Sequence, residues 1–174
     1  MGMIASLTAV DATTLTRIRS NPDLLFELLD PVAIEDEQPD APDVFSIDLD
    51  KAWHAIHYIL TDSVWEGSFP KAFLLKGGTM FGGDPDDPLS DQPSRAFSAE
   101  QTRAIADMLK SVPLAVFASK YDPRLLDAAK IYPEGIWLRD GDDAREYVTS
   151  YYDTLTTFVN SAASKGYCLL VSIG

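Results

Sequence analysis

The C-terminal end of the chain carries the pattern that most constrains its fold, a long amphipathic helix followed by a buried strand. The helix starts at Asp143, and its apolar residues recur at intervals of three or four: Tyr147, Tyr151, Leu155, Phe158 and Ala162. This spacing predicts one apolar stripe along a helix of about six turns. Lys165 and Gly166 end the helix, and the apolar run YCLLVSI then predicts a terminal strand.

The first thirty residues predict a strand and two short helices. MIASLTAV, residues 3–10, has the composition of a strand. Asp11 is an N-cap for a helix that carries Leu15 and Ile18, and Asn21-Pro22 ends it. DLLFELL, residues 23–29, predicts a second helix that ends before Pro31.

The middle of the chain alternates between irregular and helical patterns. Residues 35–43, EDEQPDAPD, predict a solvated acidic loop, and residues 62–97 predict either a long irregular stretch or a few short strands. Ser98 and Gln101 form a capping-box pattern for a helix to about Lys110. Pro113 begins the next helix, or that helix begins at Asp122-Pro123.

These elements predict a single α+β domain over residues 1–174. The length of 174 residues favours one domain with a core large enough to need no cross-links. We expect a small mixed sheet that contains the N- and C-terminal strands, flanked by four or five helices.

The charge of the chain favours some partners and disfavours others. The net charge is −13, from 27 acidic and 14 basic side chains, and it repels nucleic acids and anionic lipid. A basic protein partner would be attracted, with the acidic loop as the most accessible contact. The competing interpretation is that the acids only keep the protein soluble. With one cysteine and no signal-peptide pattern or long apolar run, we expect a cytoplasmic protein.

Both histidines lie in one segment, IDLDKAWHAIHYILT, residues 47–61, which predicts a helix that starts at Asp48 or Asp50. On a helical wheel Asp50, His54, His57 and Thr61 form a polar stripe along the rim of an apolar face that includes Trp53. An aspartate in that place can orient a histidine, so Asp50, His54 and His57 are the candidates for acid–base catalysis. The alternative is a helix at the edge of the core, with His57 mostly buried and hydrogen-bonded and His54 more exposed. Trp53, His54, His57 and Trp137 are the candidate binding residues.

Other motifs do not predict a cofactor or a metal. KGGTMFGGD, residues 76–84, lacks the spacing of a phosphate-binding loop, and DPDD, residues 84–87, lacks that of an EF-hand. Zinc needs three or four ligands, and the chain has two histidines and the lone Cys168, which we expect to be buried and inert. We therefore expect neither a bound metal nor a cofactor.

Several segments together resemble the YfbM-like family of bacterial proteins of unknown function. The resemblance rests on the following stretches: MGMIA, LDKAWHAIHYILT, KGG, SRAFSAEQTRAIADML, IYPEGIW, YYDTLTTFVNSAASKG and VSIG. Asp-Lys-x-Trp-His-x-x-His is the most specific of them. Two departures are Tyr58 in place of phenylalanine and Asp62 in place of glycine. The resemblance implies a cytoplasmic α+β domain and no established reaction, cofactor or catalytic residue.

The sequence favours a non-catalytic acidic binding protein that masks a basic protein partner such as a toxin. The alternative is a small enzyme that uses His54 or His57 with Asp50 for acid–base chemistry. An enzyme needs one of these histidines exposed in a concave pocket, whereas a binding protein needs an acidic face.

Overall fold

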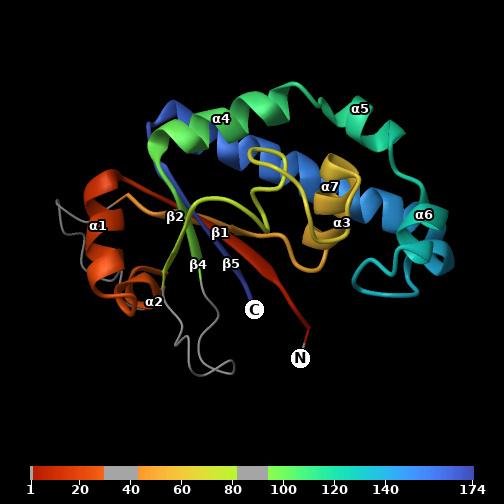
Figure 1. Ribbon diagram of the computed structural model, residues 1–174, viewed down its shortest axis with the longest axis horizontal. Helices are drawn as coiled ribbons and strands as arrows, with labels where there is room; N and C mark the ends of the chain where they lie inside the picture. The colour runs from red at the N-terminus through yellow and green to blue at the C-terminus, as the bar shows by residue number, and fades with distance from the viewer. Residues whose placement is uncertain (1, 30–42, 82–93) are drawn as a thin grey trace.

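The computed structural model describes residues 2–29, 43–81 and 94–174 (Figure 1). Twelve elements follow one another in this part of the chain. In chain order they are β1 (Ala5–Val10), α1 (Ala12–Ser20), α2 (Leu24–Leu29), β2 (Phe45–Asp48), α3 (Trp53–Thr61), β3 (Thr79–Phe81), β4 (Ser94–Phe97), α4 (Ala99–Lys110), α5 (Leu114–Ser119), α6 (Pro123–Ala128), α7 (Trp137–Ser164) and β5 (Cys168–Ile173).

The five described strands form one sheet in the order β2-β1-β5-β4-β3. The terminal strands lie side by side at its centre, from Ala5 opposite Ile173 to Val10 opposite Cys168, so the prediction that they share a sheet is confirmed. The expected mixed sheet is corrected to an antiparallel one in all four described pairings. The helices explain this: α4 leads away from the end of β4 and α7 returns to the same end, so β5 starts there and runs back (Figure 1).

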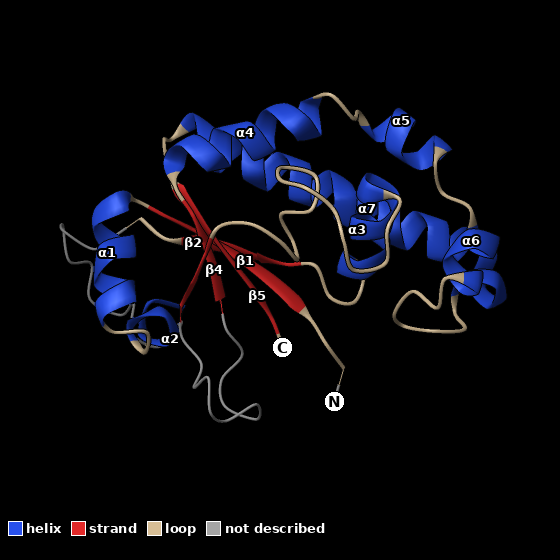
Figure 2. Cartoon of the chain, in the orientation of Figure 1, coloured by secondary structure: helices blue, strands red, loops and turns tan. Residues whose placement is uncertain are grey.

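Each face of the sheet packs against a different set of helices (Figure 2). Because side chains alternate along a strand, Leu169 and Val171 of β5 belong to the large core beneath α3, α4 and α7. Cys168 and Leu170 point the other way and pack with α1 and α2. The domain therefore has a sheet between two helical layers of unequal size, which confirms the α+β class.

Local cap signals placed the short helices well. The Asp11 side chain accepts the Thr14 N–H at 2.7 Å, and Ser98 and Gln101 form both bonds of a capping box. The two alternatives for the helix after α4 are both present, since α5 follows Pro113 and α6 has Pro123 in its first turn. The described residues thus contain seven helices rather than four or five.

Helix α7 differs from its prediction in phase and in its start. The centre of its buried face is formed by Val148, Tyr152, Leu155 and Val159. Tyr147 and Tyr151 of the predicted stripe lie half-buried at the edge of that face. Gly141, with φ 51° and ψ −115°, separates the first turn from the rest of the helix.

Helix α3 begins later than its sequence indicates. The sequence predicts a start at Asp48 or Asp50, but the helix begins at Trp53, after strand β2 and a turn in which Asp50 has a φ of 45°. At the other end Asp62 adopts the left-handed conformation, with a φ of 57°. A glycine fits this conformation without strain, which explains the residue that the family resemblance implies at position 62.

The acidic loop lies mostly outside the described residues, as does the DPDD segment. Of the loop only Asp43 is described, and its carboxylate accepts hydrogen bonds from Lys165 at 2.5 Å and from the Tyr167 hydroxyl at 3.0 Å. Among the described helices, none is both long and apolar enough to cross a membrane.

Candidate binding site

His54 is fully buried, and both of its ring nitrogens are hydrogen-bonded to backbone groups. The Tyr132 N–H donates to Nδ1 at 3.0 Å. Nδ1 therefore carries no proton, and Nε2–H donates to the Val64 carbonyl at 2.9 Å. Burial lowers the pKa of His54, which keeps the ring neutral. His54 thus joins α3 to two loops, and neither nitrogen is left to move a proton.

His57 is also fully buried, but neither of its ring nitrogens has a hydrogen-bond partner among the described residues. Burial, together with the nearby His54 ring, lowers the pKa of His57 to about 4. The backbone of Glu66 lies close enough to oppose this shift without forming a hydrogen bond. The expectation that His57 is mostly buried is confirmed, whereas the expectations that it is hydrogen-bonded and that His54 is more exposed are wrong. Two loops, which contain Val64 and Tyr132, cover His54 and bond its ring.

Asp50 does not orient either histidine. Its carboxylate accepts a hydrogen bond from the Tyr147 hydroxyl at 2.9 Å, and the same hydroxyl accepts the Lys51 N–H at 3.1 Å. Burial and the bond to Asp50 raise the pKa of Tyr147, so the phenol stays protonated and donates. The predicted stripe of Asp50, His54 and His57 does not form, because α3 begins only at Trp53 and Asp50 lies in the turn before it.

A cavity of about 440 Å³ lies beside this pair, between the start of α7 and the turn before α3. Asp50, Asp143 and Tyr147 line it, together with Lys51 and an Arg139–Asp140 pair. Arg139 donates to both oxygens of Asp140, at 2.5 and 2.8 Å, so its charge is already balanced. In the described part of the chain, Asp50 and Asp143 form no salt bridge.

The candidate tryptophans have different surroundings. Trp137 is fully buried, and its indole N–H donates to the Ile131 carbonyl at 2.7 Å, which is a structural role. Trp53 donates to the Met3 carbonyl at 3.1 Å. The Trp53 ring stacks on the His54 ring, with the two centroids 4.8 Å apart. The Trp65 ring also contacts the His54 ring, in a tilted arrangement with the centroids 4.4 Å apart.

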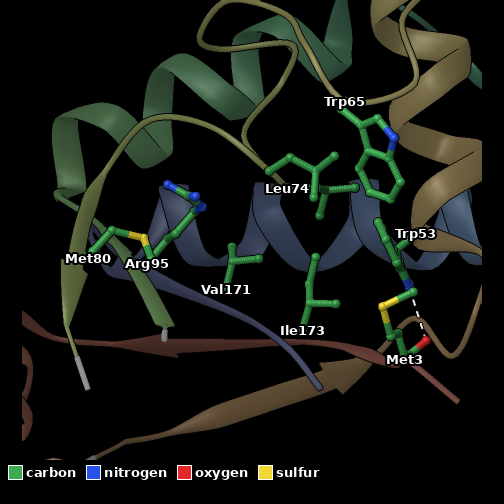
Figure 3. Close-up of a pocket in the computed structure, with 9 residues that line it drawn as sticks. Met3, Trp53, Trp65, Leu74, Met80, Arg95, Val171 and Ile173 are labelled. Atoms are coloured by element: carbon green, nitrogen blue, oxygen red, sulfur yellow. Dashed lines mark hydrogen bonds between the residues drawn. The ribbon is translucent and has the colours of Figure 1, made fainter. Parts of the chain in front are cut away.

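Trp53 and Trp65 form one wall of a second cavity, of about 210 Å³ (Figure 3). Val171 and Ile173 of β5 line it from the sheet, and Leu74 lines it from the segment after α3. Among the residues that the structure describes, Arg95 of β4 is the only charged side chain that lines it. Arg95 is not among the residues predicted from the sequence, because a single arginine in the stretch SRAF, residues 94–97, has no pattern that marks it as part of a site.

The described residues show how the possible metal ligands and the cysteine are placed. Across residues 2–29, 43–81 and 94–174, no three His, Cys, Asp or Glu side chains are grouped closely enough to hold a metal ion. Cys168 is buried in β5, and burial raises the pKa of its thiol. A thiol of this kind is a poor nucleophile.

Comparison with known proteins agrees on the family and the fold. A family model described as "Domain of unknown function (DUF1877)" matches residues 1–172. The crystal structure of YfbM from Escherichia coli, a protein of unknown function, superimposes with a TM-score of 0.68 over 98% of this chain and 99% of that one. The two sequences are 15% identical. No curated protein matches the chain.

Proposed function

The chain belongs to the DUF1877 family of domains of unknown function, and we propose that it is a non-catalytic cytoplasmic protein that binds a basic protein partner. A basic toxin is one partner of this kind, and the net charge of −13 supports a partner that is basic. The cavity between Asp50 and Asp143 is the place where a basic side chain of the partner would enter.

The surroundings of the histidines favour binding over catalysis. A general base must reach the proton that it removes, directly or through one water. The His54 nitrogens are both bonded to the backbone, and His57 is fully buried. These observations weaken the alternative of an enzyme built on His54 or His57 with Asp50.

The observation that carries the proposal is the pair of carboxylates in the cavity. Tyr147 fixes one oxygen of Asp50, and neither Asp50 nor Asp143 is in a salt bridge among the described residues. A guanidinium or ammonium group placed between them would form charge-assisted hydrogen bonds without first breaking an ion pair. The net charge of −13 would speed the approach of such a partner.

The test is calorimetric titration with a short arginine-rich peptide, followed by capture of the natural partner from cell lysate. The double variant Asp50→Asn, Asp143→Asn should weaken peptide binding about tenfold. Asparagine still accepts the Tyr147 bond and tolerates the left-handed backbone at position 50, so the fold should be kept.

The matched control is Glu100→Gln, Asp153→Asn, which removes two negative charges from exposed positions on α4 and α7. We expect this control to bind the peptide nearly as well as the unaltered protein. Equal weakening by both double variants would mean that only the overall charge matters, and the cavity would lose its role.

A further inference from the structure

The described lining of the cavity beside Trp53 and Trp65 is apolar except for one positively charged side chain, that of Arg95. Val171, Ile173 and Leu74 provide aliphatic surface, and Arg95 lies directly opposite Val171 in the sheet register. Its side chain points into the same space in Figure 3. Such a mixture suits a ligand with an apolar body and one anionic group.

The Arg95 guanidinium is half-buried, and among the described residues one hydrogen bond from it is present. One of its nitrogens donates to the Gly77 carbonyl at 3.1 Å, which holds the side chain in place. In the described residues Arg95 forms no salt bridge. A guanidinium has five N–H donors and prefers a planar carboxylate that accepts two of them.

The rim of the cavity is unusually apolar for a surface. Trp65 is 52% exposed and Met80, which lies opposite Arg95 in the sheet, is 47% exposed. Trp53 stacks on His54, and Trp65 contacts the same ring with the two planes tilted by 33°, so an aromatic ring in the cavity would join an existing aromatic cluster. Exposed apolar side chains around a pocket mark a surface that a ligand can cover.

The size of the cavity limits the ligand. A volume of about 210 Å³ corresponds to about seven water molecules at their volume in the liquid. This is room for one ring and a short chain inside the cavity.

We propose that this cavity binds a small aromatic carboxylate, with its ring against Trp65 and Trp53 and its carboxylate on Arg95. This site is separate from the acidic cavity at Asp50, and its ligand has the opposite charge. Because the whole protein is strongly negative, it repels anions in general, and any anion that binds must be held by a local cation.

Titration with 3-phenylpropionate, its neutral amide and the matching amine tests the proposal. Tryptophan emission reports binding, because covering the exposed Trp65 ring shifts its fluorescence to shorter wavelength. The unaltered protein should bind the acid about tenfold more tightly than the amide, and should bind the amine no better than the amide.

Variants then assign the preference to Arg95. Arg95→Gln should remove it, leaving acid and amide with equal affinity, whereas Trp65→Ala should weaken both ligands alike. Arg103→Gln is the matched control, since it removes one positive charge from an exposed position on α4 and should change nothing. If Arg95→Gln does not fold, as judged by circular dichroism, Arg95→Lys keeps the charge and should keep a reduced preference for the acid.

Two results would overturn the proposal. One is equal binding of acid and amide, or no binding of either, by the unaltered protein. The other is a preference for the acid that survives in folded Arg95→Gln. The peptide titrations at Asp50 and Asp143 are independent of both results, so either site can fail alone.

Discussion

The two histidines of this chain are three residues apart on α3 and differ in their hydrogen bonding. Both are fully buried, yet His54 bonds two backbone groups while His57 bonds none among the described residues. A buried polar atom without a partner costs about 1–3 kcal/mol of stability. The His57 side chain therefore lowers the stability of the fold, whereas the His54 side chain stabilises it by joining α3 to two loops.

His57→Leu should stabilise the protein by about 1 kcal/mol at pH 7, because leucine has a similar volume and no polar atom to satisfy. The gain should grow by about 2 kcal/mol at pH 5. The folded pKa of His57 is about 4, below its ordinary 6.5, so the unfolded chain binds a proton in this range that the folded chain does not. Stability from the neutral ring is thus fully present above pH 6.5 and is lost as the pH falls towards 4. Urea unfolding at both pH values measures this, and an equal difference at pH 7 and pH 5 would refute it.

His54→Ala should act in the opposite direction and destabilise the protein by about 3 kcal/mol or more. It leaves the Val64 carbonyl and the Tyr132 N–H without their partner and opens a cavity between two tryptophans. The measurement is again the free energy of unfolding in urea. A loss below about 1 kcal/mol would show that water replaces the imidazole without cost, and that His54 does not fasten the loops.

The sequence could place these side chains near a buried face but could not identify their partners. The helical wheel used only neighbours within residues 47–61. The groups that bond His54 come from positions 64 and 132, and the residue that bonds Asp50 is Tyr147. Contacts over such separations depend on how the loops pack, which periodicity does not encode. Arg95 was missed for the same reason: its significance arises from residues that surround it only in the folded chain.

At the scale of elements, the sequence predicts features that depend on neighbouring residues, and it does not predict those that depend on distant partners. Caps such as Asp11 and the Ser98–Gln101 box involve residues within three positions, and the structure confirms them. The short strands β2 and β3 carry too few residues for a period of two to stand out, and they form because a sheet partner is present. The predicted start of α3 is too early because an aspartate such as Asp50 is a common N-cap residue, whereas here it lies in the turn before the helix.

The end of α3 offers a test of backbone strain. Asp62 is exposed and has a φ of 57°, and its N–H donates to the Tyr58 carbonyl at 2.7 Å. Asp62→Gly should stabilise the protein by about 0.5–1 kcal/mol, because glycine adopts this conformation without strain. Thermal unfolding measures the effect.

The matched variant is Asp62→Ala, which keeps the strain and lacks the side chain of aspartate. We expect it to be less stable than the unaltered protein, because aspartate tolerates the left-handed conformation better than alanine does. The order glycine, aspartate, alanine in stability is the expected outcome. Alanine equal to glycine would show that the conformation at position 62 imposes no cost.

At the scale of the whole molecule, one fold carries two cavities of opposite character on the side of its sheet that packs against α3, α4 and α7. The cavity at Asp50 and Asp143 agrees in sign with the net charge, and the cavity at Arg95 opposes it. Composition indicated the first kind of partner, because charge adds up along the sequence. Composition could not indicate the anionic ligand of the Arg95 cavity, because one arginine hardly changes a net charge of −13.

The net charge also predicts which macromolecules the protein does not bind. At −13 it should bind neither DNA nor RNA at about 0.15 M salt, since each phosphate contact needs a lysine or arginine to displace counterions. Its basic side chains do not form a cluster: among the described residues Lys76, Lys110, Arg124, Arg139 and Lys165 are each paired with a carboxylate. Fluorescence anisotropy with labelled single- and double-stranded oligonucleotides checks this, with the arginine-rich peptide as the positive control. Association of that peptide should slow as salt rises, because salt screens the attraction between exposed charges. Tight binding of an oligonucleotide, or peptide association that does not depend on salt, would contradict the electrostatic reasoning.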